Sequence, residues 1–95
     1  MHDLAICLET VEHLEPQTAI ALHAMICDTA PAVLWSAATP EQGGLGHINE
    51  RPEKYWAKRF AARNMVPDFT PRELATRAGC ASWYCNNLVL WRRAA

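Results

Sequence analysis

The chain has 95 residues, a formal net charge of −1 at pH 7 and four cysteines, which limits it to one small domain spanning residues 1–95. Basic and acidic residues are scattered along it, and Arg92 with Arg93 is the clearest basic cluster. No apolar run approaches the ~18 residues of a membrane span, and the cysteines lack a metal-finger spacing. We therefore expect a cytoplasmic domain with reduced thiols and with neither a membrane nor a nucleic-acid partner.

The first third of the chain predicts a strand, a helix and a second strand. Leu4–Leu8 is a continuous apolar run, typical of a strand covered on both faces. An alanine-rich helix is expected to begin near Pro16 and to run over residues 17–29, and Pro31 ends it. A second buried strand is expected over about residues 32–37. This order over about thirty residues is the βαβ unit of a parallel sheet.

The second half predicts two further helices and two further strands. Pro52 opens a helix that extends to about Arg63. "MVPDF" follows as an edge strand, because Pro67 cannot donate to a ladder. A short helix begins after Pro71 and ends at Gly79. The last run, "SWYCNNLVLW", is rich in aromatic and branched residues and predicts a single closing strand.

The loop after the second strand, "TPEQGGLGHINER", holds three of the four glycines. It does not match a dinucleotide fingerprint, because Gly44-x-Gly46 lacks the third glycine. Two interpretations stay open: a mobile lid that uses the freedom of glycine, or an ordinary surface connection.

Polar side chains follow both strands of the predicted parallel pair. Glu9, Glu12 and His13 come directly after the first strand, within "CLETVEHLEP", and His47 and Asn49 follow the second. The carboxyl ends of parallel strands meet at one edge of a sheet, where ligands bind. We therefore expect these two groups to share a crevice.

These side chains allow two interpretations. If Thr10 begins a helical turn, Glu9, Glu12 and His13 share one face. With His47 they supply two carboxylates and two imidazoles, a set suited to Mg²⁺ or Mn²⁺, or to iron. Alternatively, Glu12 and His13 only cap the turn and bond the loop, while Glu9 faces a ligand.

Other chemistry has weaker support. His23 lies within the first helix and is expected to be structural, and no serine or cysteine has a paired base at a recognisable spacing. "PRELATRAGCASWYCNN" looks like the opening of a helix-turn-helix motif. Its second helix would be aromatic and poor in the cations that bind phosphates, so a DNA-binding function is disfavoured.

Three segments carry a resemblance to a known family. "DLAICLETVEHLEP" resembles the fourth-strand region of class I S-adenosylmethionine-dependent methyltransferases, D-L-x-x-x-x-E-x-x-E-H-hydrophobe. "LWSAATPEQGGLGHINERPEKYW" resembles the fifth strand and following loop of a bacterial and phage subgroup with the pattern S-A-A-x-P-x-Q-G-G-x-G-H-x-N-E. "WYCNNLVLW" resembles the last strand of that subgroup. Together these matches cover nearly the whole chain.

The resemblance implies an α/β fold, the C-terminal half of a Rossmann-like doubly wound sheet, with methyltransferase strands 4, 5, 7 and 6 in that spatial order. It implies methyl transfer from S-adenosylmethionine to an unknown nucleophile. By the same match, Leu8 and Glu9 would neighbour the methionine part of the cofactor, and His13, His47 and Asn49 would face the substrate.

A narrower resemblance concerns the metal. In small-RNA 2′-O-methyltransferases a Glu-x-x-Glu-His turn and a later histidine bind a divalent ion. Glu9, Glu12, His13 and His47 match that pattern, which would make them ligands of Mg²⁺ or Mn²⁺.

The chain also departs from the family, because the glycine-rich first loop, the acidic residue after the second strand and the first three strands have no counterpart in it. We therefore expect a methyltransferase half that needs an N-terminal half, in trans or in a longer parent protein, for activity. The alternative is a non-catalytic remnant or assembly module that forms a homodimer through the apolar edge at Leu4–Leu8. A metal-dependent enzyme of another kind ranks below both.

Overall fold

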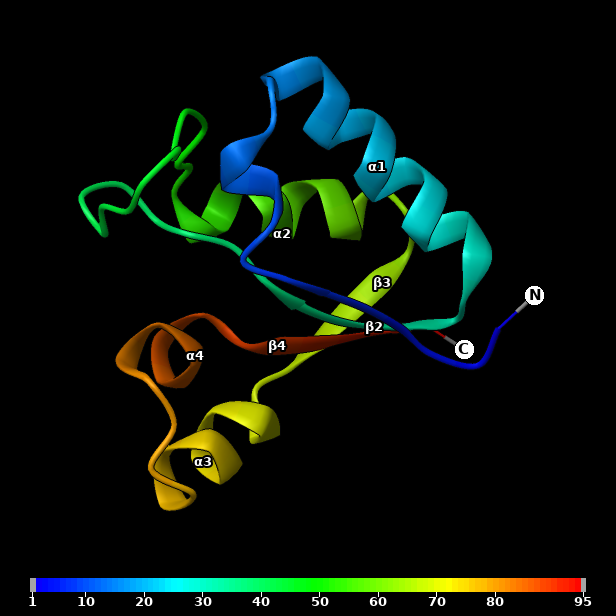
Figure 1. Ribbon diagram of the computed structural model, residues 1–95. Coiled ribbons are helices and arrows are strands. Elements are labelled where there is room, and N and C mark those ends of the chain that lie inside the picture. Colours follow the sequence, from blue (N-terminus) through cyan, green and yellow to red (C-terminus); the bar gives the residue numbers. More distant parts are fainter. Residues whose placement is uncertain (1, 95) are drawn as a thin grey trace.

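The structure, a computed structural model, describes residues 2–94 and contains a four-stranded mixed sheet with helices on both faces (Figure 1). The spatial order of the strands is β1-β2-β4-β3. The elements are β1 Ala5–Leu8, the 3₁₀ turn η1 Val11–His13, α1 Pro16–Thr29, β2 Ala32–Ser36, α2 Glu53–Ala61, β3 Met65–Asp68, α3 Thr70–Arg77, α4 Ser82–Asn87 and β4 Val89–Arg93.

The predicted βαβ unit is confirmed. Strands β1 and β2 are parallel, with Ala5 opposite Val33 and Leu8 opposite Ser36, and α1 connects them. Strand β4 then pairs antiparallel with both β2 and β3, which makes the sheet mixed. The two carboxyl ends of β1 and β2 therefore lie at the same edge, which is the feature that positions the site.

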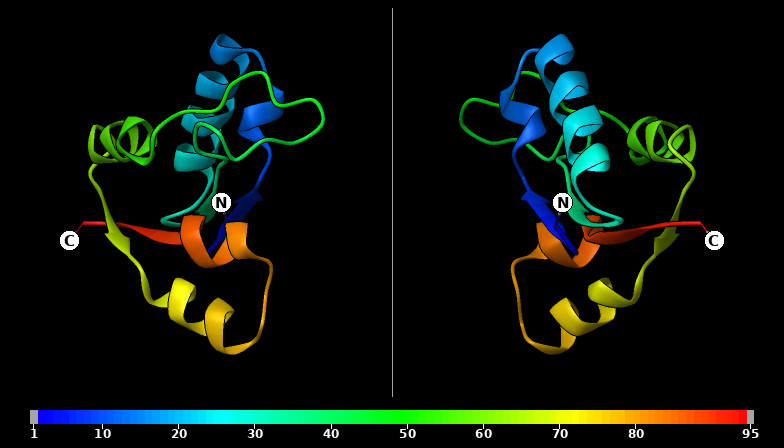
Figure 2. Two further views of the ribbon diagram at one scale, coloured as in Figure 1. Left: turned by 90° about the vertical axis from the view of Figure 1, so that its left-hand side faces the viewer. Right: turned by 90° about the vertical axis from the view of Figure 1, so that its right-hand side faces the viewer.

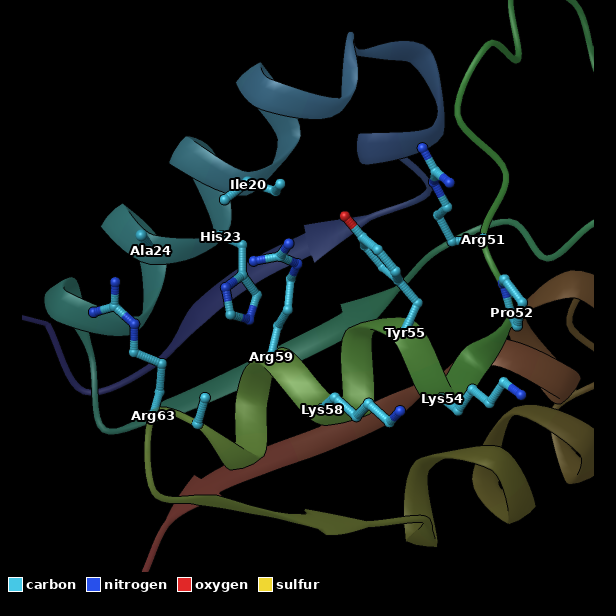
Figure 3. A pocket seen from close by; sticks show the side chains of 11 residues that line it. Ile20, His23, Ala24, Arg51, Pro52, Lys54, Tyr55, Lys58, Arg59 and Arg63 are labelled. Atoms are coloured by element: carbon cyan, nitrogen blue, oxygen red, sulfur yellow. The ribbon is translucent and has the colours of Figure 1, made fainter.

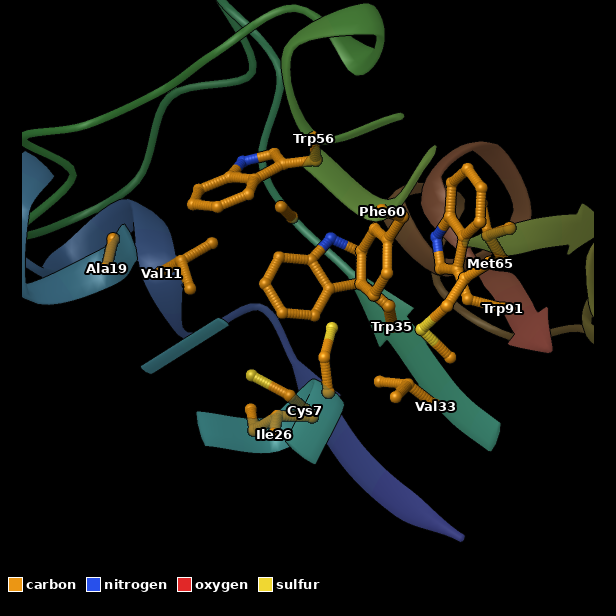
Figure 4. Packing of buried hydrophobic residues seen from close by; sticks show 13 residues of the cluster. Cys7, Val11, Ala19, Ile26, Val33, Trp35, Trp56, Phe60, Met65 and Trp91 are labelled. Carbon is orange, nitrogen blue, oxygen red and sulfur yellow. The ribbon is translucent and has the colours of Figure 1, made fainter. Parts of the chain in front are cut away.

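The helices form two layers, with α1 and α2 on one face of the sheet and α3 and α4 on the other (Figures 1 and 2). Aromatic rings fill the space under α2. Phe60 stacks on Trp91 with ring centroids 4.5 Å apart, and it meets Trp35 edge-on at 5.1 Å (Figure 4). The rest of this core consists of Cys7, Val11, Ala19, Ile26, Cys27, Val33, Ala37, Trp56, Met65 and Val89.

The two edges of the sheet differ. Strand β3 forms one edge and carries Pro67, as the sequence predicted. Strand β1 forms the other edge within the described residues, and its apolar side chains are poorly covered: Ile6 is 63% exposed, and Leu4 just before it 46%. An open strand with apolar exposure invites further pairing.

The prediction of one closing strand over "SWYCNNLVLW" is wrong. Its first part is the short helix α4, and only Val89–Arg93 forms the strand β4. The length of the partner explains this, because β2 pairs only from Ala32 to Trp35, and Val89 to Arg92 fill those positions. Residues before Val89 have no strand to pair with, and a helix satisfies their backbone groups locally.

The remaining element boundaries follow the sequence closely. Helix α2 begins after Pro52, and Gly79 follows α3 with a φ of +72°, a conformation that glycine adopts without strain. No helix among residues 2–94 has both the length and the apolar character needed to cross a membrane.

Candidate metal centre

The site lies where the carboxyl ends of β1 and β2 meet, between η1 and the loop of residues 37–52. Backbone hydrogen bonds fasten the two segments together: the N–H groups of Ile48 and Asn49 donate to the carbonyl oxygen of Glu12, at 2.8 and 3.0 Å. As the parallel strands predicted, the structure brings Glu12, His13 and His47 into one cluster.

Glu12 is the buried anchor of this cluster, with no exposed side-chain surface. Its Oε1 accepts a hydrogen bond from the backbone N–H of Ala38 at 3.2 Å. Its Oε2 has no hydrogen-bond partner among the residues described, and leaving a buried acceptor unpaired costs roughly 1–3 kcal/mol. That oxygen instead faces Nε2 of His13 at 4.0 Å and Nε2 of His47 at 3.9 Å.

Hydrogen bonds on the far side of each imidazole decide which ring nitrogen is free. His13 Nδ1 lies 3.2 Å from the carbonyl oxygen of Gly46, and His47 Nδ1 lies 2.8 Å from Oε2 of Glu50. Both partners are acceptors, so both Nδ1 atoms must carry the proton in the neutral rings. The Nε2 lone pairs of His13 and His47 are then directed to the space beside Glu12.

Glu50 holds this arrangement from behind. Besides His47, its carboxylate accepts backbone N–H groups from Gly43 at 2.9 Å and Glu41 at 3.2 Å. The hydrogen bond from His47 is the largest of the influences that lower the pKa of Glu50. Glu50 is therefore ionised at neutral pH, as an orienting partner of a metal-ligating histidine should be.

The three converging atoms can hold a cation. They lie within 4.8 Å of one another, whereas bonds of about 2.0–2.2 Å in a tetrahedral site place ligand atoms about 3.3–3.6 Å apart, so the side chains must close in by about 1 Å to hold an ion. One carboxylate and two imidazoles form the donor set of catalytic zinc and of non-haem iron centres. The predicted site for Mg²⁺ or Mn²⁺ included a second carboxylate, that of Glu9. Without it the group offers fewer of the oxygen ligands that these two ions prefer.

Glu9 lies outside this cluster. Its Oε1 accepts a hydrogen bond from Gln42 Nε2 at 2.8 Å, while its Oε2 is buried and has no partner within residues 2–94. Its backbone has a φ of +48°, and its N–H bonds to the carbonyl oxygen of Ser36 at 2.9 Å. Leu8 and Glu9 thus mark the end of β1, and Glu9 is not part of the group formed by Glu12, His13 and His47.

Asn49 has a different position from the two histidines. It is only 3% exposed, its Nδ2 lies 3.4 Å from the carbonyl oxygen of Val11, and its Oδ1 accepts from Arg51 Nε at 2.7 Å. These bonds tie the loop to η1. A contact between Asn49 and a substrate stays a prediction.

Two glycines of the loop provide a sharp test of this geometry. A Cβ at Gly44 would lie 2.6 Å from Cε1 and Nε2 of His47, whereas a Cβ at Gly43 would meet nothing within 4 Å. Both residues have positive φ, +74° at Gly43 and +151° at Gly44, so both alanine variants place a Cβ on backbone that side chains rarely adopt. We expect Gly44→Ala to displace the His47 ring and to weaken Zn²⁺ binding by about tenfold, measured by calorimetry.

Gly43→Ala is the control for that experiment and is expected to bind Zn²⁺ as the unmodified protein does. Equal affinities for the two variants would show that the position of the His47 ring does not matter to the cation.

Sequence reasoning missed two residues of this region. Glu50 lies three residues after His47. This spacing points to Glu50 only if one already expects His47 to need a hydrogen-bond acceptor that orients its ring. Gln42 bridges Glu9 and Asn87, accepting from Asn87 Nδ2 at 2.8 Å, and no local pattern indicates this contact.

Comparisons of the chain with protein-family models, with curated proteins and with solved structures found no match.

Proposed function

We propose that this chain forms the C-terminal half of an S-adenosylmethionine-dependent methyltransferase domain in which Glu12, His13 and His47 hold a divalent cation on the side of the methyl acceptor. The observation that carries the proposal is the convergence of Glu12 Oε2 and two imidazole Nε2 atoms at the carboxyl edge of β1 and β2. This is the edge at which open α/β sheets bind their ligands.

The architecture supports the methyltransferase part. The sheet order β1-β2-β4-β3, with the last strand between the second and the third, is the order that the resemblance implies for strands 4, 5, 7 and 6. Strand β1 is the edge at which a strand from an N-terminal half would add, and the exposure of Ile6 beside that edge fits such a partner.

The cofactor side would be the end of β1. The buried Oε2 of Glu9 lacks a partner among the described residues, and the ammonium group of the methionine part of S-adenosylmethionine is a donor that would satisfy it. Leu8, half-buried next to it, would contribute apolar contact. The cofactor supplies the methyl group.

The acceptor side would be the metal cluster. A divalent cation held there would act as a Lewis acid that lowers the pKa of a bound hydroxyl. This chain's part is to hold the cation: Glu12 from the buried side, and His47 through a ring fixed by Glu50. The side chain of His13 is 44% exposed, so the cluster opens to solvent on that side.

The proposal is tested by titration with S-adenosylhomocysteine. We expect no binding to the chain alone and micromolar binding to a chimera that carries the first three strands of a complete methyltransferase joined ahead of β1. Glu9→Gln should weaken the binding to the chimera by about tenfold, the loss of one charge-assisted hydrogen bond. Binding to the monomeric chain alone, or none to a folded chimera, would contradict the half-domain assignment.

A second candidate, an assembly module, is favoured by the exposed apolar residues at the β1 edge. Light scattering in the same experiment distinguishes it. A dimer that Ile6→Lys dissociates, but that Ile48→Lys leaves intact, would support the module. Ile48 is a matched control because the two isoleucines are similarly exposed, Ile6 at 63% and Ile48 at 58%. A chain that stays monomeric at high concentration excludes it.

A further inference from the structure

A groove of about 520 Å³ runs between α1 and α2, on the outer side of the helical layer (Figure 3). It has no part in the candidate metal centre. Five of the chain's nine lysines and arginines line it, although the formal net charge of the whole chain is −1. These are Arg51, Lys54, Lys58, Arg59 and Arg63.

Helical spacing gathers these cations. Within α2, positions 55 and 59 are four apart, as are 54 and 58, so they fall on neighbouring rows of the helix. Arg51 and Arg63 flank the two ends of α2 and extend the same surface. Read along the sequence the charges look scattered. The expectation that Arg92 and Arg93 form the clearest basic cluster is therefore wrong.

The positive charge of the groove is largely uncompensated. Within residues 2–94, the ion pairs include one acidic partner for a groove cation, Asp28, which binds Arg63 at 2.9 Å. The guanidinium groups of Arg51 and Arg59 lie 5.2 and 5.0 Å from the ring centroid of Tyr55. An aromatic ring attracts cations but does not neutralise them, so the groove keeps a positive potential.

Apart from Asp28 at its C-terminal end, the wall formed by α1 adds no negative charge. It presents Ile20, Ala24 and His23, and the pKa of His23 is lowered to about 4, first by burial and then by the charges of Arg63 and Arg59. The positive charges of the groove thus help to keep His23 neutral. One wall is apolar and the other is cationic.

We propose that this groove binds a small molecule that carries two or more phosphoryl groups. The volume lies within the range of small-molecule sites. The nine residues of α2 alone rise about 13 Å, and Arg51 and Arg63 lie beyond its two ends. This is more than a single phosphate can bridge, so one phosphate would reach only part of the cations. Arginine and lysine are the side chains that bind phosphoryl oxygens most strongly.

This inference does not rest on the proposed methyl transfer, since it concerns another surface and its test needs no activity. Calorimetric titrations at low salt would use inorganic triphosphate, pyrophosphate and phosphate. We expect triphosphate to bind with one site and at least about tenfold more tightly than phosphate. Arg59→Gln should weaken triphosphate binding by about tenfold or more.

Arg77→Gln is the matched control, because Arg77 is exposed on α3, away from the groove. It is expected to bind triphosphate as the unmodified protein does. Equal losses in the two variants, or equal affinities for the three anions, would indicate general charge attraction and overturn the proposal. Binding of an oligonucleotide without binding of triphosphate would also overturn it.

A second readout locates the ligand. An anion beside Arg59 and Arg63 offsets the charges that depress the pKa of His23, so saturating triphosphate should raise that pKa, as followed by NMR. An unchanged His23 pKa in the presence of tightly bound triphosphate would place the anion elsewhere and contradict the assignment to the groove.

Discussion

The Glu12→Gln variant is expected to lose divalent-cation binding by at least about 100-fold while it keeps its fold. The amide retains an oxygen that can accept the hydrogen bond from Ala38 N–H, and it replaces the unpartnered Oε2 with a nitrogen that is no ligand. Removing an outer-shell partner typically costs 10–100-fold in metal affinity, so the loss of a direct ligand should exceed that. Burying a neutral amide costs less than burying a carboxylate, so the free energy of unfolding without metal should stay equal or rise.

Calorimetry with Zn²⁺ and Mn²⁺, and thermal unfolding with each ion or with a chelator, measure both effects. A cation at 100 times its Kd stabilises the folded state by about 2.7 kcal/mol, and this gain should vanish in Glu12→Gln. Glu15→Gln makes the same change three residues later at an exposed position and should leave both readouts unaltered. Unchanged metal affinity in Glu12→Gln would remove the metal from the proposed function.

The parts of the fold that could be predicted from sequence were those set by local chemistry. An apolar run, a proline-started helix and a second apolar run predicted the parallel pair, because adjacent parallel strands need a crossover connection of a dozen or more residues, usually a helix. Pro67 specified an edge strand by the donor it lacks. The topology also predicted that Glu12, His13 and His47 would lie at one edge of the sheet, although it placed Glu9 with them.

The parts that could not be predicted depend on partners distant in sequence. The boundary between α4 and β4 is set by the length of β2, which nothing within "SWYCNNLVLW" reveals. The spacing of Glu9, Glu12 and His13 predicted that all three share one face of a turn. Glu9 instead has a positive φ, and its carboxylate accepts a hydrogen bond from Gln42. The basic groove required knowing that one face of α2 is left uncovered by α1.

A pH dependence of stability follows from His23, which sequence identified only as structural. Its imidazole is 3% exposed and meets the ring of Phe60 at 4.3 Å and that of Trp56 at 5.6 Å. Burial, followed by the charges of Arg63 and Arg59, lowers its pKa from 6.5 to about 4. Between these two values the unfolded chain binds a proton that the folded chain does not, so stability falls as the pH falls.

The shift corresponds to about 3 kcal/mol of unfolding free energy, present in full above pH 6.5 and lost by about pH 4. This is a large share of the 5–15 kcal/mol typical of a domain.

Urea unfolding at a series of pH values should show that His23→Leu loses less stability than the unmodified protein over this window, since Leu carries no proton. Exposed His2 is the control, and His2→Leu should keep the full dependence. Glu50 and Asp68 also have lowered pKa values, so their protonation likewise reduces stability as the pH falls. Both groups are present in every variant, so the difference between the curves of His23→Leu and the unmodified protein isolates the effect of the buried imidazole. Parallel curves for His23→Leu and the unmodified protein would mean that His23 is protonated within the core, and the neutral wall of the groove would then be a charged one.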